Sequence, residues 1–325
     1  MQKIPFRSPY AKKTMRIVFL GTPDFAVPSL QMLMDEGYHV VGVFTQPDRP
    51  VGRSKKLQAS PIKQCAQENG IDVFQVEKIR QAEGSRILQE LQPDLMITAA
   101  FGQILSKENL QAPTIGCINV HGSLLPKYRG AAPIQWAVIN GETETGITTM
   151  LTDEGLDTGD MLEKRVVHIG ENETAGELFD RMAGEGASLL KSTLQKLMDG
   201  QLEREKQDEA KATHCKSLRK EEGKIDWARS ARQIFNQVRG MNPWPCAFSE
   251  IDGSTMKIWT CEVMDMEDRD YEMGEIVYAD AKHGLIVKTG DGFLSLKEIQ
   301  MAGSKRMDAN AYLNGRSWPV GACFQ

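Results

Sequence analysis

Residues 116–126 have the sequence GCINVHGSLLP, and this stretch decides how the front half of the chain folds. Its first part, 116–121, is a short and mostly apolar run that is followed by a glycine and a serine. A run of this length next to turn residues predicts a buried β-strand. Residues two apart on a strand share one face, so Asn119 and His121 should point the same way.

Five further apolar runs lie in the front half, and amphipathic stretches separate them. This alternation is typical of a parallel sheet with helices on both faces, the doubly wound α/β class. The predicted strands are residues 17–20, 39–44, 72–76, 94–100, 116–121 and 146–152.

Caps and glycines mark the helix boundaries. Ser60 is a suitable N-cap because Pro61 occupies the first helical position, and Gly70 should end that helix. A longer helix is predicted over 174–198, interrupted by Gly184 and Gly186.

The back of the chain has a different pattern. Residues 200–216 are polar and charged with almost no apolar period, which predicts a linker. An amphipathic helix at 228–239 and short alternating strands follow, which predicts a small β-barrel. With 325 residues, two domains are expected. The predicted order is an extension (1–14), a catalytic domain (15–199), the linker (200–216) and a C-terminal domain (217–325).

The composition limits the class of protein. A content of 41% hydrophobic and 26% charged residues predicts a globular chain, and a net charge of -5 argues against nonspecific coating of nucleic acid. The six cysteines lack a CxxC spacing, so neither a zinc site nor a disulfide framework is predicted, and a reducing cytoplasm is expected. No apolar run approaches the roughly 20 residues of a membrane span, so no membrane partner is expected.

Three polar residues lie at or after the ends of predicted strands. Asn119 and His121 end one strand, and Asp157 follows the end of another. Sites in open parallel sheets lie beyond the carboxyl ends of the strands, so these side chains are expected to meet there. An amide, an imidazole and a carboxylate can guide an acyl group from one nitrogen to another. Taken singly, His121 also fits a hydrogen-bonded structural role, and Asp157 fits a turn.

Two stretches resemble ligand motifs only in part. Asp153 and Asp157 begin a pattern like a calcium loop, but Lys164 stands where the loop requires a glutamate. The turn 21–25 contains a proline and no G-x-G-x-x-G pattern, so it predicts a helix start and no dinucleotide site. No metal is therefore assigned.

Residues 119–126 together with 156–159 resemble the 10-formyltetrahydrofolate-dependent formyltransferase family. Other stretches are similar to the members of that family that act on methionyl-tRNA. These stretches are residues 19–25, 45–50, 128–135 and 242–245, and the resemblance extends from about Met15 to the C-terminus.

The resemblance implies a Rossmann-like formyltransferase domain followed by a small OB-like barrel that binds tRNA. Asn119, His121 and Asp157 would be catalytic, 10-formyltetrahydrofolate would be the formyl donor, and initiator methionyl-tRNA would be the acceptor of a monomeric enzyme. The implied folate-binding residues are Phe101, Gly102, Gln103, Ile104, Leu105, Ser123, Leu124, Leu125, Pro126 and Asp153. From the residues alone, 101–105 fits an ordinary strand-to-helix loop equally well.

In the predicted reaction, the α-amino group of the aminoacyl ester attacks the formyl carbon at N10 of the folate directly. Asn119 and protonated His121 would donate hydrogen bonds to the formyl oxygen as negative charge grows on it. Asp157 would orient the imidazole and accept the proton of the attacking ammonium, directly or through water. No serine or cysteine nucleophile is needed.

The loop 46–63 is basic although the chain is acidic. Its charged residues are Arg49, Arg53, Lys55, Lys56 and Lys63 against Asp48, which gives 5 − 1 = +4. Such a cluster attracts phosphates, so Arg49, Arg53, Lys55 and Lys56 are predicted to bind tRNA, with Arg53 as the main contact. A solvated basic loop is the alternative.

Two other functions stay open. A formyltransferase for an amino sugar nucleotide or a purine precursor would share the three polar residues without needing the basic loop. A noncatalytic tRNA- or folate-binding protein would share only the fold. Trp244 and Trp259 could stack on bases, but in so small a barrel they are expected in the core.

Overall fold

The computed structural model describes residues 11–51, 56–315 and 318–325, with the backbone alone for Val51 and Lys56. The chain divides into two compact units. The first comprises residues 1–133, 144–168 and 179–215, and the second comprises residues 134–143, 169–178 and 216–325. Most of the predicted extension, up to residue 10, lies outside the described residues, and the predicted domain boundaries stay predictions.

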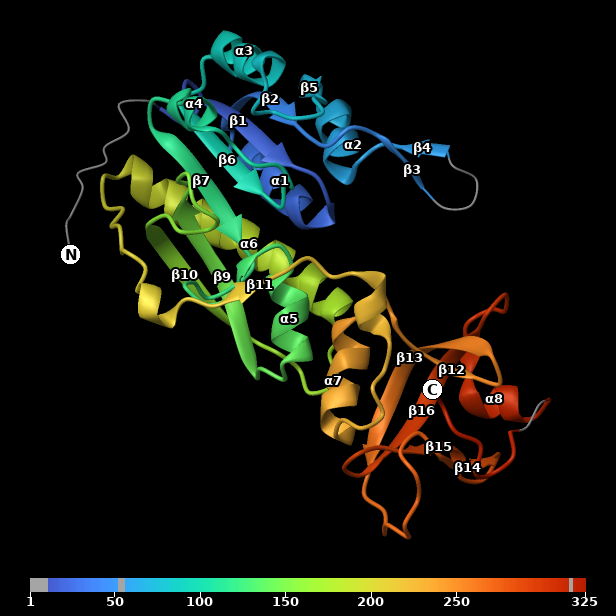
Figure 1. Cartoon of the computed structure of the whole chain (residues 1–325). Coiled ribbons are helices and arrows are strands. Elements are labelled where there is room, and N and C mark those ends of the chain that lie inside the picture. The colour runs from blue at the N-terminus through green and yellow to red at the C-terminus, as the bar shows by residue number, and fades with distance from the viewer. Residues whose placement is uncertain (1–10, 52–55, 316–317) are drawn as a thin grey trace. The chain divides into compact units, whose positions relative to one another are not determined.

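The first unit is built on a seven-stranded sheet of order β10-β9-β7-β6-β1-β2-β5 (Figure 1). Its strands are β1 (Arg16–Gly21), β2 (His39–Phe44), β5 (Val73–Phe74), β6 (Leu95–Ala99), β7 (Gly116–His121), β9 (Glu144–Leu151) and β10 (Met161–His168). The five strands from β7 to β5 run parallel. β9 is antiparallel to β7, and β10 is antiparallel to β9. This is the mostly parallel, Rossmann-like sheet that the sequence predicts.

All six predicted strands are present, and β2 and β7 have the predicted bounds. The parallel direction expected for the sixth strand, β9, is wrong. β10 is absent from the predicted strands because the charged run Glu163–Arg165 at its centre hides any apolar alternation. An edge strand tolerates such charges, since its outer side meets solvent.

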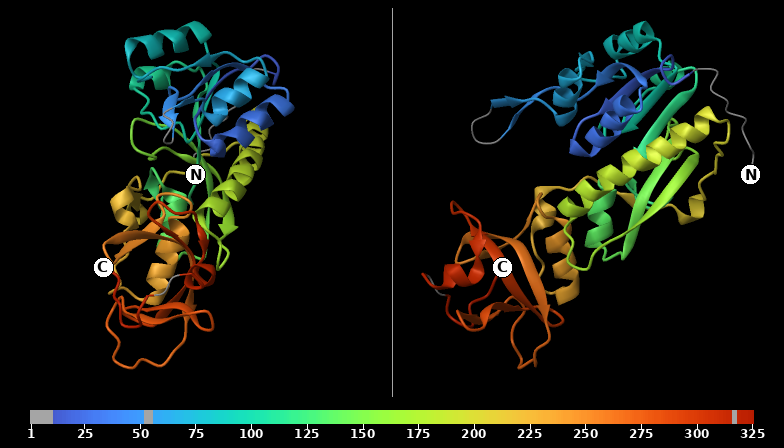
Figure 2. Two further views of the ribbon diagram at one scale, coloured as in Figure 1. Left: turned by 90° about the vertical axis from the view of Figure 1, so that its right-hand side faces the viewer. Right: turned by 180° about the vertical axis from the view of Figure 1, so that it is seen from behind.

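Helices cover both faces of this sheet. They are α1 (Val27–Asp35), α2 (Pro61–Glu68), α3 (Ala82–Leu91), α4 (Lys107–Gln111) and most of α6 (Ala175–Met198). Leu88 of α3 packs with Val18 and Met96 in one buried cluster. On the opposite face, α6 crosses the strands (Figure 2), and a Cβ at Gly186 would lie only 3.0 Å from Val120 Cγ1.

The predicted starts of α1 and α2 are confirmed. The 3₁₀ turn η1 (Asp24–Ala26) leads into α1, and the Ser60 hydroxyl accepts a hydrogen bond from the backbone of Lys63 at the start of α2. The predicted interruption of α6 at Gly184 and Gly186 is wrong, because the helix is continuous. Gly186 permits the close approach of α6 to the sheet rather than a break.

The second unit contains a six-stranded antiparallel sheet of order β12-β13-β16-β15-β14, with β17 paired to β16. Its elements are η3 (Lys220–Gly223), α7 (Ala231–Gly240), β12 (Ala247–Ile251), β13 (Ser254–Met264), β14 (Ile276–Asp280), β15 (Gly284–Lys288), β16 (Phe293–Met301), β17 (Met307–Asp308) and α8 (Ala309–Leu313). α5 (Pro133–Ile139) also belongs to this unit, except for its first residue. The sheet agrees with the predicted small OB-like barrel, left open between β12 and β14 in this strand order.

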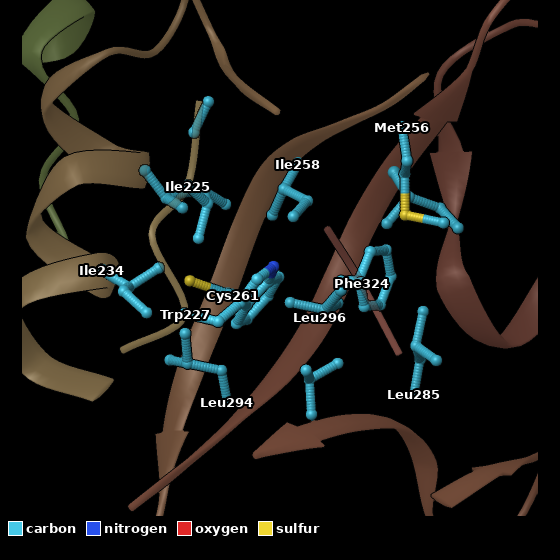
Figure 3. Packing of buried hydrophobic residues seen from close by; sticks show 14 of the residues in the cluster. Ile225, Trp227, Ile234, Met256, Ile258, Cys261, Leu285, Leu294, Leu296 and Phe324 are labelled. Atoms are coloured by element: carbon cyan, nitrogen blue, oxygen red, sulfur yellow. The ribbon is translucent and has the colours of Figure 1, made fainter. Parts of the chain in front are cut away.

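The core of the second unit is a cluster of aliphatic and aromatic side chains (Figure 3). The rings of Trp227 and Phe324 lie 5.2 Å apart in it, and the Trp227 indole donates a hydrogen bond to Ser249 Oγ at 2.9 Å. The prediction that Trp244 is a core residue is wrong, since its side chain is 55% exposed. Trp259 is only half-buried.

Candidate active site

β7 presents Asn119 and His121 on one face of the sheet, and the adjacent strand orients the first of them. Thr98 of β6 is the register partner of Asn119, and its hydroxyl donates to Asn119 Oδ1 at 2.8 Å. The amide oxygen is therefore held toward Thr98. Within the described part of the chain, Asn119 Nδ2 donates no hydrogen bond, so the NH₂ group is left for a ligand.

His121 is 6% exposed, and both of its ring nitrogens face oxygen atoms. Nε2 lies 3.0 Å from the carbonyl oxygen of Tyr128, and Nδ1 lies 3.7 Å from Oδ2 of Asp157. A carbonyl can only accept, so Nε2 carries hydrogen; a second hydrogen on Nδ1 makes an imidazolium that faces the carboxylate. Because 3.7 Å exceeds a hydrogen bond, Nδ1 is the nitrogen with room for a ligand or a water.

Asp157 lies in the loop 152–160 between β9 and β10. Its backbone φ is +54°, in the left-handed region that Asp adopts more readily than most residues. Asp153 Oδ1 accepts hydrogen bonds from Gly155 N at 3.1 Å and from the Thr158 hydroxyl at 2.7 Å. Asp153 therefore shapes the loop that presents Asp157.

His121 and Asp157 come together, with Asn119 on the same face of β7 as His121, but by a different route from the expected one. β9 runs antiparallel to β7, so its carboxyl end pairs with Ile118 and not with the end of β7. The loop 152–160 then returns toward His121, and Asp157 Oδ2 accepts a hydrogen bond from Gly130 N at 2.8 Å. The carboxylate is thus placed by a loop contact and not by two parallel strand ends.

The stretch Ser123–Pro126 forms a buried turn after β7. Ser123 and Leu125 are buried, and the Ser123 hydroxyl donates to the carbonyl of Lys127 at 2.6 Å. The Thr148 hydroxyl donates to Ser123 O and accepts from Leu125 N. These bonds fix the turn. The surface left for a ligand therefore belongs to the two half-buried residues, Leu124 and Pro126.

The loop Phe101–Leu105 follows β6 and borders an open pocket of about 400 Å³. Gln103 fixes the loop by donating to Val76 O at 3.0 Å and accepting from Ile79 N at 2.7 Å, while Ile104 is 68% exposed. The pocket is lined by Gln46, Arg49, Glu77, Lys78, Arg80, Gly102, Gln103 and Ile104. Three basic residues against one acidic residue favour an anionic group there.

The basic loop contains a short hairpin of β3 (Arg49–Val51) and β4 (Lys56–Gln58). Arg49 is exposed at its start. Arg53 and Lys55 lie outside the described residues, and only the backbone of Lys56 is described.

Lys63 is a basic residue of this loop whose side chain forms an ion pair within the protein. Its Nζ contacts Asp48 Oδ2 at 2.6 Å and Gln75 Oε1 at 2.8 Å. The hydrogen bond from Lys63 lowers the pKa of the Asp48 carboxyl, and that from Gln75 adds to the effect. These two charges cancel, so the excess of +4 comes from the four predicted tRNA-binding residues.

Two further residues outside the predicted set support the loop that presents Asp157. Gln207 Nε2 donates to the carbonyls of Asp157 and Gly159, and the buried Arg129 donates to Gln207 Oε1. Arg129 lies in the stretch 128–135, which supports the family resemblance, so the sequence does mark this residue as one that could matter for the site. No local pattern marks Gln207, because it lies in the polar segment 200–216.

Cys117 of β7 is near the candidate site but is no nucleophile. Burial raises the pKa of its thiol to about 11, so the thiol stays protonated at neutral pH. In residues 11–51, 56–315 and 318–325, no three His, Cys, Asp or Glu side chains form a group that could hold a metal. None of the helices in those ranges has the length and apolar character needed to cross a bilayer.

Family models and individual relatives both identify this chain as similar to formyl transferases. Residues 15–194 match the model of the formyl transferase family, and residues 217–317 match the formyl transferase C-terminal domain. The methionyl-tRNA formyltransferase of Ruminiclostridium cellulolyticum is 53% identical over 94% of this chain and 98% of its own length. That of Agathobacter rectalis is 49% identical over 95% and 99%, respectively.

A solved structure shares the fold at lower identity. It is an N-formyltransferase from Helicobacter canadensis in complex with folinic acid and dTDP-3-aminofucose. The TM-score is 0.64 at 21% identity, and the match covers 90% of this chain and 100% of the other. At this identity the match shows the fold alone.

Proposed function

The chain belongs to the formyl transferase family, and from this membership we propose that it transfers the formyl group of 10-formyltetrahydrofolate to the α-amino group of initiator methionyl-tRNA. Relatives that share about half of its residues over nearly their whole length are named for this activity. The observation that carries the proposal is the distance of 3.7 Å between His121 Nδ1 and Asp157 Oδ2. His121 lies on β7, which also presents the amide of Asn119. The product, N-formylmethionyl-tRNA, would serve translation initiation in the cytoplasm.

Asn119 is proposed to stabilise the formyl oxygen. Attack by the amine makes the formyl carbon tetrahedral and moves negative charge onto its oxygen. Thr98 holds the amide so that Nδ2 is available as a donor before substrate arrives. A donor fixed in advance needs no reorganisation during the reaction and lowers the barrier by about 3 to 4 kcal/mol.

His121 and Asp157 are proposed to supply a second donor and a proton acceptor. Tyr128 O anchors Nε2 of the imidazolium, so Nδ1 would donate to the formyl oxygen, directly or through water. Asp157 Oδ2 is held by Gly130 N, and its Oδ1 accepts no hydrogen bond within the described residues. That free oxygen would accept the proton that the amine loses.

The proposed transfer is balanced without a covalent enzyme intermediate. A bond forms between the α-amino nitrogen and the formyl carbon, and the bond from that carbon to N10 of the folate breaks. The amine loses one proton, and N10 gains one. The free amide and the carboxylate are sufficient for these steps, so no side-chain nucleophile is required.

The folate is proposed to lie along the loop Phe101–Leu105, the half-buried members of Ser123–Pro126 and the Asp153 turn. The pocket beside Gly102–Ile104 has Lys78 and Arg80 in its lining, which suits the carboxylates of the folate's glutamate. No metal is needed for any of these contacts.

The tRNA is proposed to contact Arg49, Arg53, Lys55 and Lys56 of the basic loop 46–63, and further phosphates are proposed to contact the OB-like unit. In that unit, the Arg306 guanidinium lies 4.6 Å from the Trp259 ring centroid on a half-buried surface. The accessible part of a half-buried aromatic ring beside a cation is a suitable platform for a base or a phosphate. The enzyme is proposed to act as a monomer.

The proposed activity is tested by measuring formyl transfer from 10-formyltetrahydrofolate to charged initiator tRNA, free methionine and amino sugar nucleotides in parallel. We expect transfer to the charged tRNA and none to the small amines. Transfer to a sugar nucleotide instead would assign the chain to the alternative substrate class. His121→Ala should abolish transfer while leaving tRNA binding intact, and unchanged transfer would remove the role of His121.

The tRNA site is tested by a triple variant of the basic loop, Arg53→Ala with Lys55→Ala and Lys56→Ala. We expect weaker tRNA binding and a shallower salt dependence, because fewer counterions are released, with nearly unchanged folate affinity. An equal loss of folate affinity would contradict a separate tRNA surface.

A further inference from the structure

Arg129 has the largest fully buried side chain in the described residues, at 1% exposure. A buried guanidinium is destabilising unless its donors are bonded. Its Nε donates to Gln207 Oε1 at 3.0 Å, and its terminal nitrogens donate to the two carboxylate oxygens of Glu209 at 2.9 and 2.7 Å. The Glu209 hydrogen bond raises the pKa of Arg129, so the guanidinium stays charged.

Gln207 links this ion pair to the loop that presents Asp157. Because Oε1 of Gln207 accepts from Arg129, its NH₂ group points the other way. It donates to the carbonyls of Asp157 at 2.7 Å and of Gly159 at 2.8 Å. Both amide hydrogens are thus used on the backbone around a residue whose φ is +54° and which needs support from its surroundings.

The same segment fixes the strand that touches both proposed catalytic side chains. β8 (Arg129–Gly130) pairs with β11 (His214–Cys215), and the Thr213 hydroxyl accepts from Tyr128 N at 2.8 Å. The neighbouring Tyr128 O contacts His121, and Gly130 N contacts the Asp157 carboxylate. Displacement of the segment 207–215 would therefore move the contacts of both His121 and Asp157.

We propose that Gln207, held by Arg129, is a positioning residue that places the Asp157 carboxylate beside His121. It acts through the backbone of the loop and does not contact the substrate. The inference rests on the proposed function, since it requires Asp157 to take part in the reaction. A purely structural role, as one more partner of Arg129, is the competing explanation.

Gln207→Ala and Glu209→Ala separate the two explanations, because each removes one partner of Arg129 but only Gln207 contacts the Asp157 loop. Each substrate is varied while the other is saturating, and kcat is expressed per folded enzyme from circular dichroism. We expect Gln207→Ala to lower kcat about 10- to 100-fold with KM within about threefold, as for a slightly misplaced catalytic group. Glu209→Ala should lower Tm with kcat within about twofold. Equal Tm losses with unchanged kcat in both variants would overturn the proposal.

Gln207→Glu provides a second measurement that does not depend on the stability of the alanine variant. A carboxylate at 207 still pairs with Arg129 but cannot donate to the two loop carbonyls at neutral pH. We expect a Tm that is lowered no more than in Gln207→Ala, because the contact with Arg129 is kept, and a kcat as low as that of Gln207→Ala. A native kcat in Gln207→Glu would show that only the Arg129 partner matters.

The dependence on Asp157 is tested by combining Gln207→Ala with Asp157→Ala. If Gln207 acts through Asp157, its removal should have almost no further effect on kcat in the Asp157→Ala background. The same factor in both backgrounds would overturn the positioning role. Full activity of Asp157→Ala alone would instead refute the proposed role of Asp157 in the transfer, whereas a loss in Asp157→Ala with an unaffected Gln207→Ala would refute only the positioning.

Discussion

β7 and the loop 152–160 contribute to one candidate site, but different forces hold them. β7 lies between β6 and β9, with backbone hydrogen bonds on both sides. The loop is held mainly by single polar contacts: Asp153 within it, Gly130 on its carboxylate and Gln207 on its carbonyls. One half of the site is thus part of the sheet, and the other half depends on a few side chains.

This difference has a consequence for substitutions. A change on β7 that keeps the backbone should alter the chemistry and leave the fold intact, because the ladder does not depend on the polar side chains. A change in the contacts of the loop should alter both position and stability, because no second set of bonds replaces them. The substitutions below test this contrast in order of decreasing effect.

Asp157→Asn should have the largest effect. The amide oxygen can still accept from Gly130 N, so the loop keeps its place, but the negative charge and the proton acceptor are lost. We expect kcat to fall about 10³-fold, within the range for a general base, with little change in Tm. Asp153→Asn, which keeps the turn acceptor, is the matched control and should remain within about tenfold of wild type. Rapid-quench or steady-state transfer assays would measure both, and a kcat for Asp157→Asn near wild type would contradict the role of the carboxylate.

Asn119→Ala should follow, with a decrease in kcat of about 10²- to 10³-fold, the usual effect of removing one oxyanion donor. Thr98→Val keeps the size of the side chain but removes the hydroxyl that orients the amide. Its effect should be smaller, about tenfold, and should vanish in the Asn119→Ala background. Thermal unfolding should show little loss in Asn119→Ala, since β7 is held by its ladder. An equal effect of Thr98→Val in both backgrounds would mean that Thr98 acts elsewhere.

The same contrast explains how much the sequence could predict. The bounds of β7 and the shared face of Asn119 and His121 follow from apolar periodicity, which is a local signal. The direction of β9 and the contacts of Gln207 depend on pairing between distant segments, for which a single sequence has no local signal. The prediction that Asp157 approaches His121 agrees with the structure, although the parallel strand on which it depends is wrong. The polar segment 200–216 lacks apolar period because its contacts are hydrogen bonds, so it has the pattern of a linker.

Gly130→Ala should destabilise the first unit, because a Cβ there would lie 2.1 Å from the carbonyl oxygen of Cys215 and φ is +119°. The pairing of β8 with β11 would have to open, which we expect to cost about 3 kcal/mol and to lower kcat as well. Gly37→Ala is the control, since it has a positive φ of +74° but open space around the Cβ. It should lose only about 1 kcal/mol, with kcat unchanged. Urea unfolding would measure both, and equal losses would show that the close contact with Cys215 is unimportant.

Gly184→Ala should change the free energy of unfolding by less than Gly130→Ala, and should raise it rather than lower it. A Cβ at this exposed position of α6 meets nothing within 4 Å, so alanine should add about 0.5 to 1 kcal/mol through its higher helix propensity. Gly186→Ala is the matched comparison, because its Cβ would press on Val120 at 3.0 Å and offset that gain. Denaturant midpoints at constant m-value would compare them. A stabilisation of equal size at both positions would mean that α6 can move away from the sheet without cost.

Removal of the ion pair between Asp48 and Lys63, beside the basic hairpin, should have the smallest effect on stability. The pKa of Asp48 is lowered, chiefly by the hydrogen bond from Lys63 and also by that from Gln75, so the folded state favours the ionised carboxyl. A lowered folded pKa gives stability that is present above the unfolded pKa of about 3.9 and is lost as pH falls through the folded value. Asp48→Asn should therefore lower the stability slightly at pH 5 to 7, by less than about 1 kcal/mol, with a small decrease in Tm. The difference should disappear as pH falls through the lowered folded pKa of Asp48. Lys63→Ala should reduce the difference, because the larger of the two hydrogen bonds that lower the pKa is gone; a difference of unchanged size would assign the effect to the Gln75 hydrogen bond.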